Sequence, residues 1–255
     1  FTVNHDGDIR FGLGAVKGVG EAAVQSIMEE RRKNGPFLGI FDFVQRVNLN
    51  ACNKKNMECL ALAGGFDSFP ELKREQYFAV NSKGEVFLET LMRYGNRYQA
   101  DKAAAVNSLF GGENVIDVAT PEIPQGVERW SDLDRLNRER DLVGIYLSAH
   151  PLDEFSIVLE HVGNTRMADL EDKAALVGRE ITMGGIVTSV RRGVSKNGNP
   201  YGIAKIEDYS GSTEIPFWGN DWVTYQGYLN EGTFLYIKAR CQAKQWRQDE
   251  LEVKI

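Results

Sequence analysis

The chain has 255 residues, of which 42% are hydrophobic and 26% are charged, a composition typical of a globular protein with one large or two modest domains. Its formal net charge of -6 argues against a protein that coats nucleic acid indiscriminately, because such proteins need a broad excess of Lys and Arg. No apolar stretch approaches the roughly 20 residues of a membrane-spanning helix, and the three cysteines cannot all pair, so we expect a cytoplasmic protein without a membrane partner.

Residues 1–105 are predicted to form a helical domain. From Ile9 to about Gln99, apolar residues recur at steps of three and four positions, as in helices that bury one face. Glycines separate these stretches. We therefore expect several helices that are joined by glycine turns.

The most informative turn of this domain is Lys17-Gly18-Val19-Gly20, which precedes a predicted helix. A Gly-hydrophobic-Gly turn between two helices is a helix-hairpin-helix pattern, in which the backbone bends tightly and leaves amides free to hold a phosphate. Ala23 follows Gly20 by three residues, where a small side chain lets the two helices pack closely. The alternative is an ordinary turn between helices that binds nothing.

A second predicted helix begins at Lys54 and Lys55 and ends at Gly64-Gly65. The two glycines are either a second phosphate-binding hairpin or an ordinary helix C-cap, and we favour the C-cap. Lysines at the start of a helix oppose its dipole, which is consistent with a bound anion but does not establish one.

Residues 106–130 are predicted to be a linker, because glycines, prolines and small residues replace the helical pattern. Within it, Leu109 and Phe110 are two large apolar residues in a polar, Gly-rich surrounding. Such residues are costly in water unless something covers them. Either they fold back onto this chain or a partner receives them.

Residues 131–175 are predicted to be connecting helices. Ser131 and Asp134 have the spacing of a helix N-cap, so we expect a helix from about Asp132 to Val143. A shorter helix is expected to begin at Pro151.

In residues 176–255 the apolar residues recur at every second position, so this segment is predicted to form a five-stranded β-barrel. A single helix is expected between the third and fourth strands. This order is that of the oligonucleotide/oligosaccharide-binding fold, the OB-fold. The whole chain is thus predicted to be an α+β multidomain protein, with a helix-hairpin-helix domain, a linker with connecting helices, and an OB-fold.

An OB-fold that binds single-stranded DNA needs aromatic faces for stacking and basic groups for phosphates. The alternation of polarity in the strands implies that several of its aromatic residues belong to the core instead. The aromatic residues of this segment include Phe217, Trp218, Trp222 and Tyr225. The residues predicted to contact single-stranded DNA are Arg191, Arg192, Lys196, Tyr201, Lys244, Trp246 and Arg247.

Catalytic motifs are scarce in this sequence. The three histidines lie far apart, and acidic pairs such as Glu29-Glu30 lack the further ligands of a two-metal site. No nucleotide-binding P-loop, Ser-His-Asp series or HExxH motif occurs. We therefore expect no catalytic residues, no metal and no cofactor in this chain.

The order of motifs resembles the C-terminal half of a known family, the alpha subunits of bacterial DNA polymerase III. The likeness covers nearly the whole chain and includes the runs IRFGLGAVKGVGEAAVQSI, NKKNMECLALAGGFDSF, NSLFGG, LVGIYLSAHPLDEF and GGIVTSVRRGVSKNGNPYGIAKIEDYSGSTEIPFW. Because the chain starts at Phe1 and stops at Ile255 inside an apparent strand, we interpret it as a fragment.

The resemblance implies a DNA-directed DNA polymerase as the parent protein, with Mg²⁺ in the parent and no catalytic residues here. It implies that the turn from Lys17 to Gly20 holds the backbone of duplex DNA and that the OB-fold lies near the single-stranded template. Other replisome subunits are implied partners.

The resemblance also implies that a peptide in the linker docks on the sliding clamp. The family's peptide usually begins with Gln, where this chain has Val106, so a polar anchor is missing. The candidate clamp-binding residues are Val106, Asn107, Ser108, Leu109 and Phe110.

Two other functions remain open from the sequence alone. The chain could be a protein-interaction scaffold within the replisome that does not touch DNA, or a free-standing metal-dependent nuclease. Salt-sensitive binding of DNA distinguishes a DNA-binding region from the scaffold, which does not bind DNA. The missing carboxylate cluster argues against the nuclease.

Overall fold

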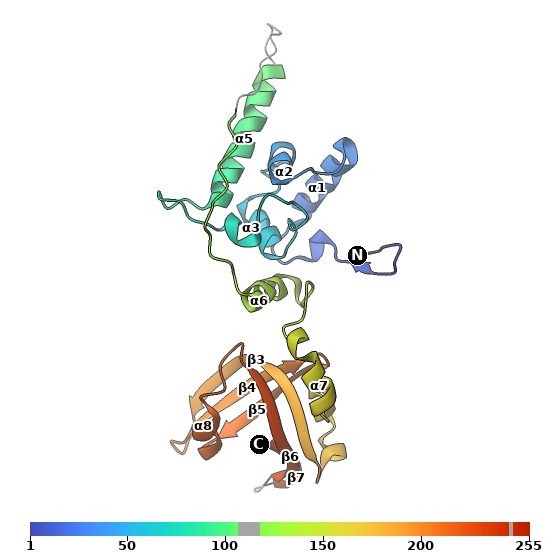
Figure 1. The fold of residues 1–255 in the computed structure, drawn as a ribbon, viewed down its shortest axis with the longest axis vertical. Coiled ribbons are helices and arrows are strands. Elements are labelled where there is room, and N and C mark those ends of the chain that lie inside the picture. Colours follow the sequence, from blue (N-terminus) through green and yellow to red (C-terminus); the bar gives the residue numbers. More distant parts are fainter. Residues whose placement is uncertain (107–117, 245–246) are drawn as a thin grey trace. The chain divides into compact units, whose positions relative to one another are not determined.

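The computed structural model describes residues 1–106, 118–244 and 247–255, although of residues 106, 244 and 247–250 it describes the backbone alone. The chain divides into two compact units, Phe1–Ser148 and Ala149–Ile255 (Figure 1). This boundary falls inside the predicted connecting segment 131–175. Within the described ranges, none of the helices combines the length and the apolar character that crossing a bilayer requires.

The first unit is mainly helical, as predicted (Figure 1). It opens differently from the sequence expectation, because two short paired strands and one 3-10 turn, Leu13–Ala15, precede the first α-helix. Its elements are β1 (Thr2–Val3), β2 (Ile9–Arg10), α1 (Glu21–Asn34), α2 (Ile40–Arg46), α3 (Lys54–Leu62), α4 (Arg74–Tyr77), α5 (Phe87–Val106) and α6 (Asp132–Val143).

Helix α1 shows how the local sequence sets an element's bounds. Glu21 lies in its first turn, and three basic residues, Arg31 to Lys33, lie in its last turn, so the charges at both ends favour the helix dipole. Ala23 and Ile27, four residues apart, are its buried residues. The burial of Ala23 agrees with the small side chain that the hairpin pattern requires.

One hydrophobic core holds the first unit together. Residues from α1, α2, α3 and α5 contribute to it, and Ile40, Val44, Met57, Leu88 and Leu91 are fully buried. In addition, Gln99 on α5 donates hydrogen bonds to the carbonyl oxygens of Val44 and Val47, at 2.8 Å and 2.9 Å. The core and these bonds fix α5 against α2.

A buried ion pair joins α4 to α6. The Arg74 guanidinium, 5% exposed, lies 3.0 Å from a carboxylate oxygen of Glu139, which is 1% exposed. Arg74 also pairs with Asp67 at 2.5 Å. The other Glu139 oxygen accepts the backbone N–H groups of Leu147, at 2.8 Å, and Ser148, at 2.7 Å. This cluster anchors the last residues of the first unit.

The second unit is a curled antiparallel sheet with the strand order β5-β4-β3-β6-β7 (Figure 1). All five predicted strands and the helix before the fourth of them are present. Among the described residues, no ladder joins the two edge strands β5 and β7, so the sheet is a half-barrel. Its elements are α7 (Ser156–Val162), β3 (Glu180–Val194), β4 (Pro200–Asp208), β5 (Gly211–Trp218), α8 (Asn220–Tyr225), β6 (Phe234–Lys244) and β7 (Arg247–Lys254).

The core of the second unit lies on the concave face of the sheet. Along β4 and β5 the inward residues alternate with outward ones, so Ala204, Ile206, Ile215 and Phe217 are buried. Trp222 on α8 is buried in the same core. The opposite, outward face of β4 and β5 is thereby left to solvent.

Candidate nucleic-acid interface

The turn Lys17-Gly18-Val19-Gly20 has the geometry of a tight hairpin. Gly18 has φ +86°, in the region that side-chain-bearing residues rarely adopt, and a Cβ there would lie 2.7 Å from the Cys59 sulfur. Val19 is 7% exposed and its N–H donates to the carbonyl of Val16 at 3.0 Å. The buried valine fixes the turn to the core, while Lys17 and both glycines remain at the surface.

Gly20 is the N-cap of α1, and no side chain caps the helix there. The first amides of an α-helix have no partner within the helix, so they are available to an anion. A Cβ on Gly20 would meet nothing within 4 Å, and its φ of -75° suits any residue. The approach to the first turn of α1 is therefore open.

Gly64 and Gly65 are the helix C-cap that we favoured. Gly64 has φ +80°, and its N–H donates to the carbonyl of Ala61 at 3.3 Å. The N–H of Gly65 donates to the carbonyl of Leu60 at 2.7 Å. These two bonds form a Schellman motif, which satisfies the end of α3 without a ligand.

The outward face of the OB-fold carries a pair of aromatic rings, one half-buried and one exposed. Tyr201 on β4 lies opposite Trp218 on β5, and the two ring centroids are 4.8 Å apart. Trp218 is 52% exposed. The Tyr201 ring covers Gly193 on β3, where a Cβ would approach the ring within 2.8 Å. We call Tyr201, Trp218 and Gly193 the aromatic shelf.

The two arginines of β3 that are predicted to contact single-stranded DNA, Arg191 and Arg192, lie on opposite faces of the sheet. Arg191 points outward with the aromatic shelf and pairs with Glu214 on β5 at 2.5 Å. Arg192 points the other way, lies 5.9 Å from the Trp222 ring and donates to Asn230 at 3.4 Å. Consecutive residues of a strand alternate in this manner. Arg191 and Tyr201 are thus brought together, and Arg192 is not.

The remaining predicted DNA-contacting residues are less fully described. Lys196 is exposed in the turn between β3 and β4. Lys244 ends β6 and Arg247 begins β7, but their side chains are not described, and Trp246 lies outside the described residues. In the predicted clamp peptide, Val106 is the last residue of α5, and Asn107, Ser108, Leu109 and Phe110 lie outside the described residues.

From the sequence, Trp218 is one of several aromatic residues of the OB-fold, and it is not among the residues predicted to contact single-stranded DNA. Alternation along β5 could have identified it, because Phe217 is apolar and buried, so Trp218 next to it must face outward. The same reasoning does not apply to Trp222, which lies on a helix and is buried. In the structure, Tyr201 and Trp218 therefore form the aromatic shelf, whereas Phe217 and Trp222 belong to the core.

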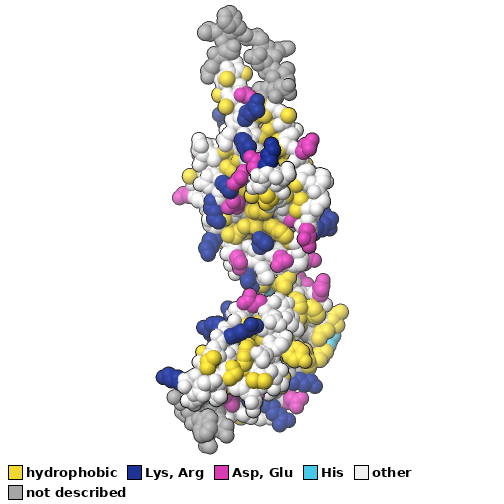
Figure 2. Space-filling view, turned by 90° about the vertical axis from the view of Figure 1, so that its left-hand side faces the viewer, with side chains coloured by type: hydrophobic (Ala, Val, Ile, Leu, Met, Phe, Trp, Pro, Cys, Tyr) yellow, Lys and Arg dark blue, Asp and Glu magenta, His cyan; other side chains and the backbone are white. Residues whose placement is uncertain are grey.

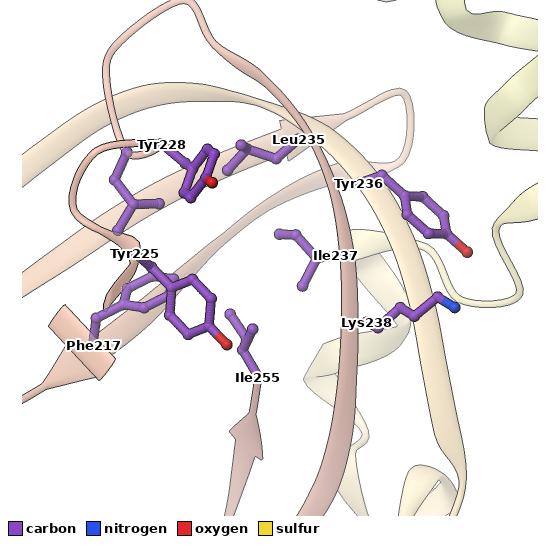
Figure 3. A pocket seen from close by; sticks show the side chains of 9 residues that line it. Phe217, Tyr225, Tyr228, Leu235, Tyr236, Ile237, Lys238 and Ile255 are labelled. Carbon is purple, nitrogen blue, oxygen red and sulfur yellow. The ribbon is translucent and has the colours of Figure 1, made fainter. Parts of the chain in front are cut away.

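A pocket of about 490 Å³ opens on the concave side of the half-barrel (Figure 3). Phe217, Tyr225, Ile237 and Ile255 point into it, whereas Tyr236 points away from it on the other side of β6. This pocket lies on the opposite face of the sheet from the aromatic shelf. None of the described residues that line it is a predicted DNA-contacting residue.

Surface charges do not form one large basic area in the view of Figure 2, where Lys and Arg alternate with Asp and Glu. Among the described residues, no group of three or more His, Cys, Asp or Glu side chains is arranged to hold a metal ion. Burial raises the pKa of the Cys52 thiol to about 11, so this thiol is not an activated nucleophile. Backbone amides, aromatic rings and individual exposed cations such as Lys17 and Arg191 remain as the groups that could bind DNA.

Two family models match the chain. Residues 1–77 match the helix-hairpin-helix motif, and residues 181–255 match the OB-fold nucleic acid binding domain. Both predicted folds are thereby confirmed, and the turn from Lys17 to Gly20 and the aromatic shelf lie inside the matched regions.

The chain is also similar to the alpha subunit of DNA polymerase III from several bacteria. It is 32% identical to the Pasteurella multocida protein over 240 residues and 30% identical to the Mycobacterium tuberculosis protein over 244 residues, matches that cover 94% and 93% of the chain. The Escherichia coli protein is 29% identical over 248 residues, or 94% of the chain. The chain spans 20% of the length of each of these relatives. The predicted resemblance is confirmed.

Proposed function

We propose that this chain is a DNA-binding and clamp-tethering region of a replicative DNA-directed DNA polymerase. In this proposal the turn from Lys17 to Gly20 holds the backbone of duplex DNA, and the OB-fold binds the single-stranded template. Polymerisation and its Mg²⁺ belong to the whole protein rather than to this region. The similarity to polymerase alpha subunits over 94% of the chain supports the proposal.

The observation that carries the proposal is the aromatic shelf. Two adjacent rings, one of them 52% exposed, lie on the outward face of the β4–β5 pair. In OB-folds, bases of a single strand stack on such rings, and this contact does not depend on sequence. Arg191 stands on the same face, where a phosphate would compete with Glu214 for its guanidinium.

The shelf is tested by measuring the affinity of Trp218→Ala and Tyr201→Ala for a labelled single strand. Each stacked base contributes on the order of 1 to 3 kcal/mol, so each variant should bind the single strand clearly more weakly. Tyr228→Ala is the matched control, because Tyr228 is 65% exposed in the same unit but lies on the pocket side. Equal losses in all three variants would refute the assignment.

The hairpin is tested with Gly20→Leu. A Cβ at this position meets nothing within 4 Å, so the fold should be retained, but the leucine side chain would obstruct a phosphate that approaches the first turn of α1. Duplex affinity should fall by similar factors for unrelated sequences. Unchanged duplex affinity in a folded Gly20→Leu variant would exclude this site.

The clamp contact is proposed for residues 106–110. With Val106 in place of the usual glutamine, we expect weak binding, on the order of tens of micromolar or about -6 kcal/mol. The double variant Leu109→Ala with Phe110→Ala should abolish binding of the purified sliding clamp and leave thermal stability nearly unchanged. A loss of several kcal/mol in stability would instead mean that both residues belong to the core.

Two outcomes would replace the proposal. Binding of replisome subunits without any salt-sensitive DNA binding would favour a protein-interaction scaffold. Cleavage of DNA by the chain upon addition of Mg²⁺ or Mn²⁺ would favour a nuclease.

A further inference from the structure

A hydrogen bond from a buried side chain links the start of α3 to the hairpin turn. Asn56, 6% exposed, donates a hydrogen bond from its side-chain amide to the carbonyl oxygen of Gly18 at 2.8 Å. Its side-chain oxygen also accepts the N–H of Asn53, at 3.2 Å, in the capping box that begins α3. One buried side chain therefore fixes both the hairpin turn and the first turn of α3.

This arrangement places Lys55 beside the hairpin. Its Cε lies 3.9 Å from the position that a Cβ on Gly18 would occupy. Cys59, one helical turn further along α3, lies below the same glycine, at 2.7 Å from that position. Lys55 and Cys59 are four residues apart, so they share the face of α3 that meets the turn.

The two adjacent lysines of α3 differ in their partners. The Lys54 ammonium pairs with the carboxylate of Glu89 on α5 and lies 3.9 Å from that of Glu58. Lys55 is exposed and makes no ion pair within the part of the chain that the structure describes. Lys17, on the turn itself, is exposed in the same way. Two uncompensated cations therefore flank Gly18.

We infer that Lys55 is a second phosphate-binding cation of the hairpin site and acts with Lys17 on the backbone of duplex DNA. A compact ammonium group beside free backbone amides is suited to a phosphate, which accepts hydrogen bonds from both. Lys54, although adjacent in sequence and equal in charge, contributes nothing to this contact because two carboxylates already compensate it. The inference rests on the proposed binding of duplex DNA by this turn.

The experiment compares Lys55→Ala with Lys54→Ala in the 255-residue chain. Duplex affinity is measured at several salt concentrations for each variant. A lysine that neutralises one phosphate accounts for about 0.9 of the slope of log affinity against log salt concentration. Lys55→Ala should therefore make the slope less negative by about 0.9, equally for unrelated sequences, and Lys54→Ala should leave it unchanged. Lys55→Arg, which keeps the charge, should restore most of the affinity.

The outcomes separate this inference from the proposed function. If Gly20→Leu weakens duplex binding but Lys55→Ala leaves the slope unchanged, the inference is wrong and the proposed hairpin site stands. Equal slope changes in both lysine variants would also overturn it, because the effect would then be one of overall charge. If neither Gly20→Leu nor Lys55→Ala affects binding, the proposed site itself is wrong.

Discussion

Glu139→Gln is expected to destabilise the first unit severely. The change keeps the size of the side chain but removes its negative charge, which faces the Arg74 guanidinium at 3.0 Å with both groups almost fully buried. It also replaces one acceptor oxygen by an NH₂ group. That group would confront either the guanidinium or the N–H donors of Leu147 and Ser148.

The magnitude follows from the burial of both partners. Removing one member of a buried ion pair typically costs about 3 to 5 kcal/mol, because the other charge stays buried without compensation. Asp67 remains beside Arg74, but its side chain is 48% exposed, so its attraction is screened by water. We therefore expect a loss near the lower end of that range, about 3 kcal/mol.

The pH dependence gives a second readout of the same group. Burial alone would raise the pKa of Glu139, but hydrogen bonds from Ser148, Leu147 and Arg74 outweigh it and hold this pKa below its usual range. A carboxyl whose pKa is lower in the folded state stabilises the fold above its unfolded pKa of about 4.3. That stabilisation is lost as the pH falls through the folded pKa. Glu139→Gln should lack this part of the acid sensitivity.

The assay is urea denaturation at pH 7 and at several lower values, followed by circular dichroism of the helical unit. Glu85→Gln is the matched control, because Glu85 pairs with Arg93 at the surface and its loss should not measurably change stability. The reasoning is refuted if Glu139→Gln is as stable as Glu85→Gln at pH 7.

Three further predictions concern other sites. Gly18→Ala should cost about 1 to 2 kcal/mol of stability through its positive φ alone, whereas Gly20→Ala should cost much less, as differential scanning calorimetry would reveal. Trp222→Ala should remove about 3 to 5 kcal/mol because this ring fills the core of the second unit, whereas Trp218→Ala should remove about 1 kcal/mol, measured by urea titration. Burial lowers the pKa of His150 despite the attraction of Asp153, so NMR should show its ring titrating below the range of an exposed histidine. Protonation of this ring should destabilise the second unit as the pH falls through its lowered pKa.

The sequence predicts the second unit well because each strand leaves a local signal. Alternation along β4 and β5 separates Ala204 and Ile206 from their outward neighbours, and the helix before the fourth strand has its own polar start. Helix α6 is likewise marked by Ser131, whose side chain accepts the N–H of Asp134 as expected. Local patterns of this kind are sufficient for element type and for much of the topology.

The parts that the sequence could not supply depend on distant contacts. Arg74 and Glu139 are 65 positions apart, and neither position differs locally from an exposed helical residue. The contrast between Lys54 and Lys55 depends on Glu89, which lies 35 positions from Lys54. The short strands before Leu13 escaped prediction because two-residue strands carry no periodicity.

Gly193 is important for the aromatic shelf although it has no side chain with which to contact a nucleotide. It has no side chain, but a Cβ there would lie 2.8 Å from the Tyr201 ring, so this ring would have to shift. In a library of random variants selected for single-strand binding, variants with any substitution at Gly193 should therefore be depleted. This is expected although Gly193 contributes no side chain to the contact with the ligand. A ranking of positions by their distance to bound DNA would overlook it.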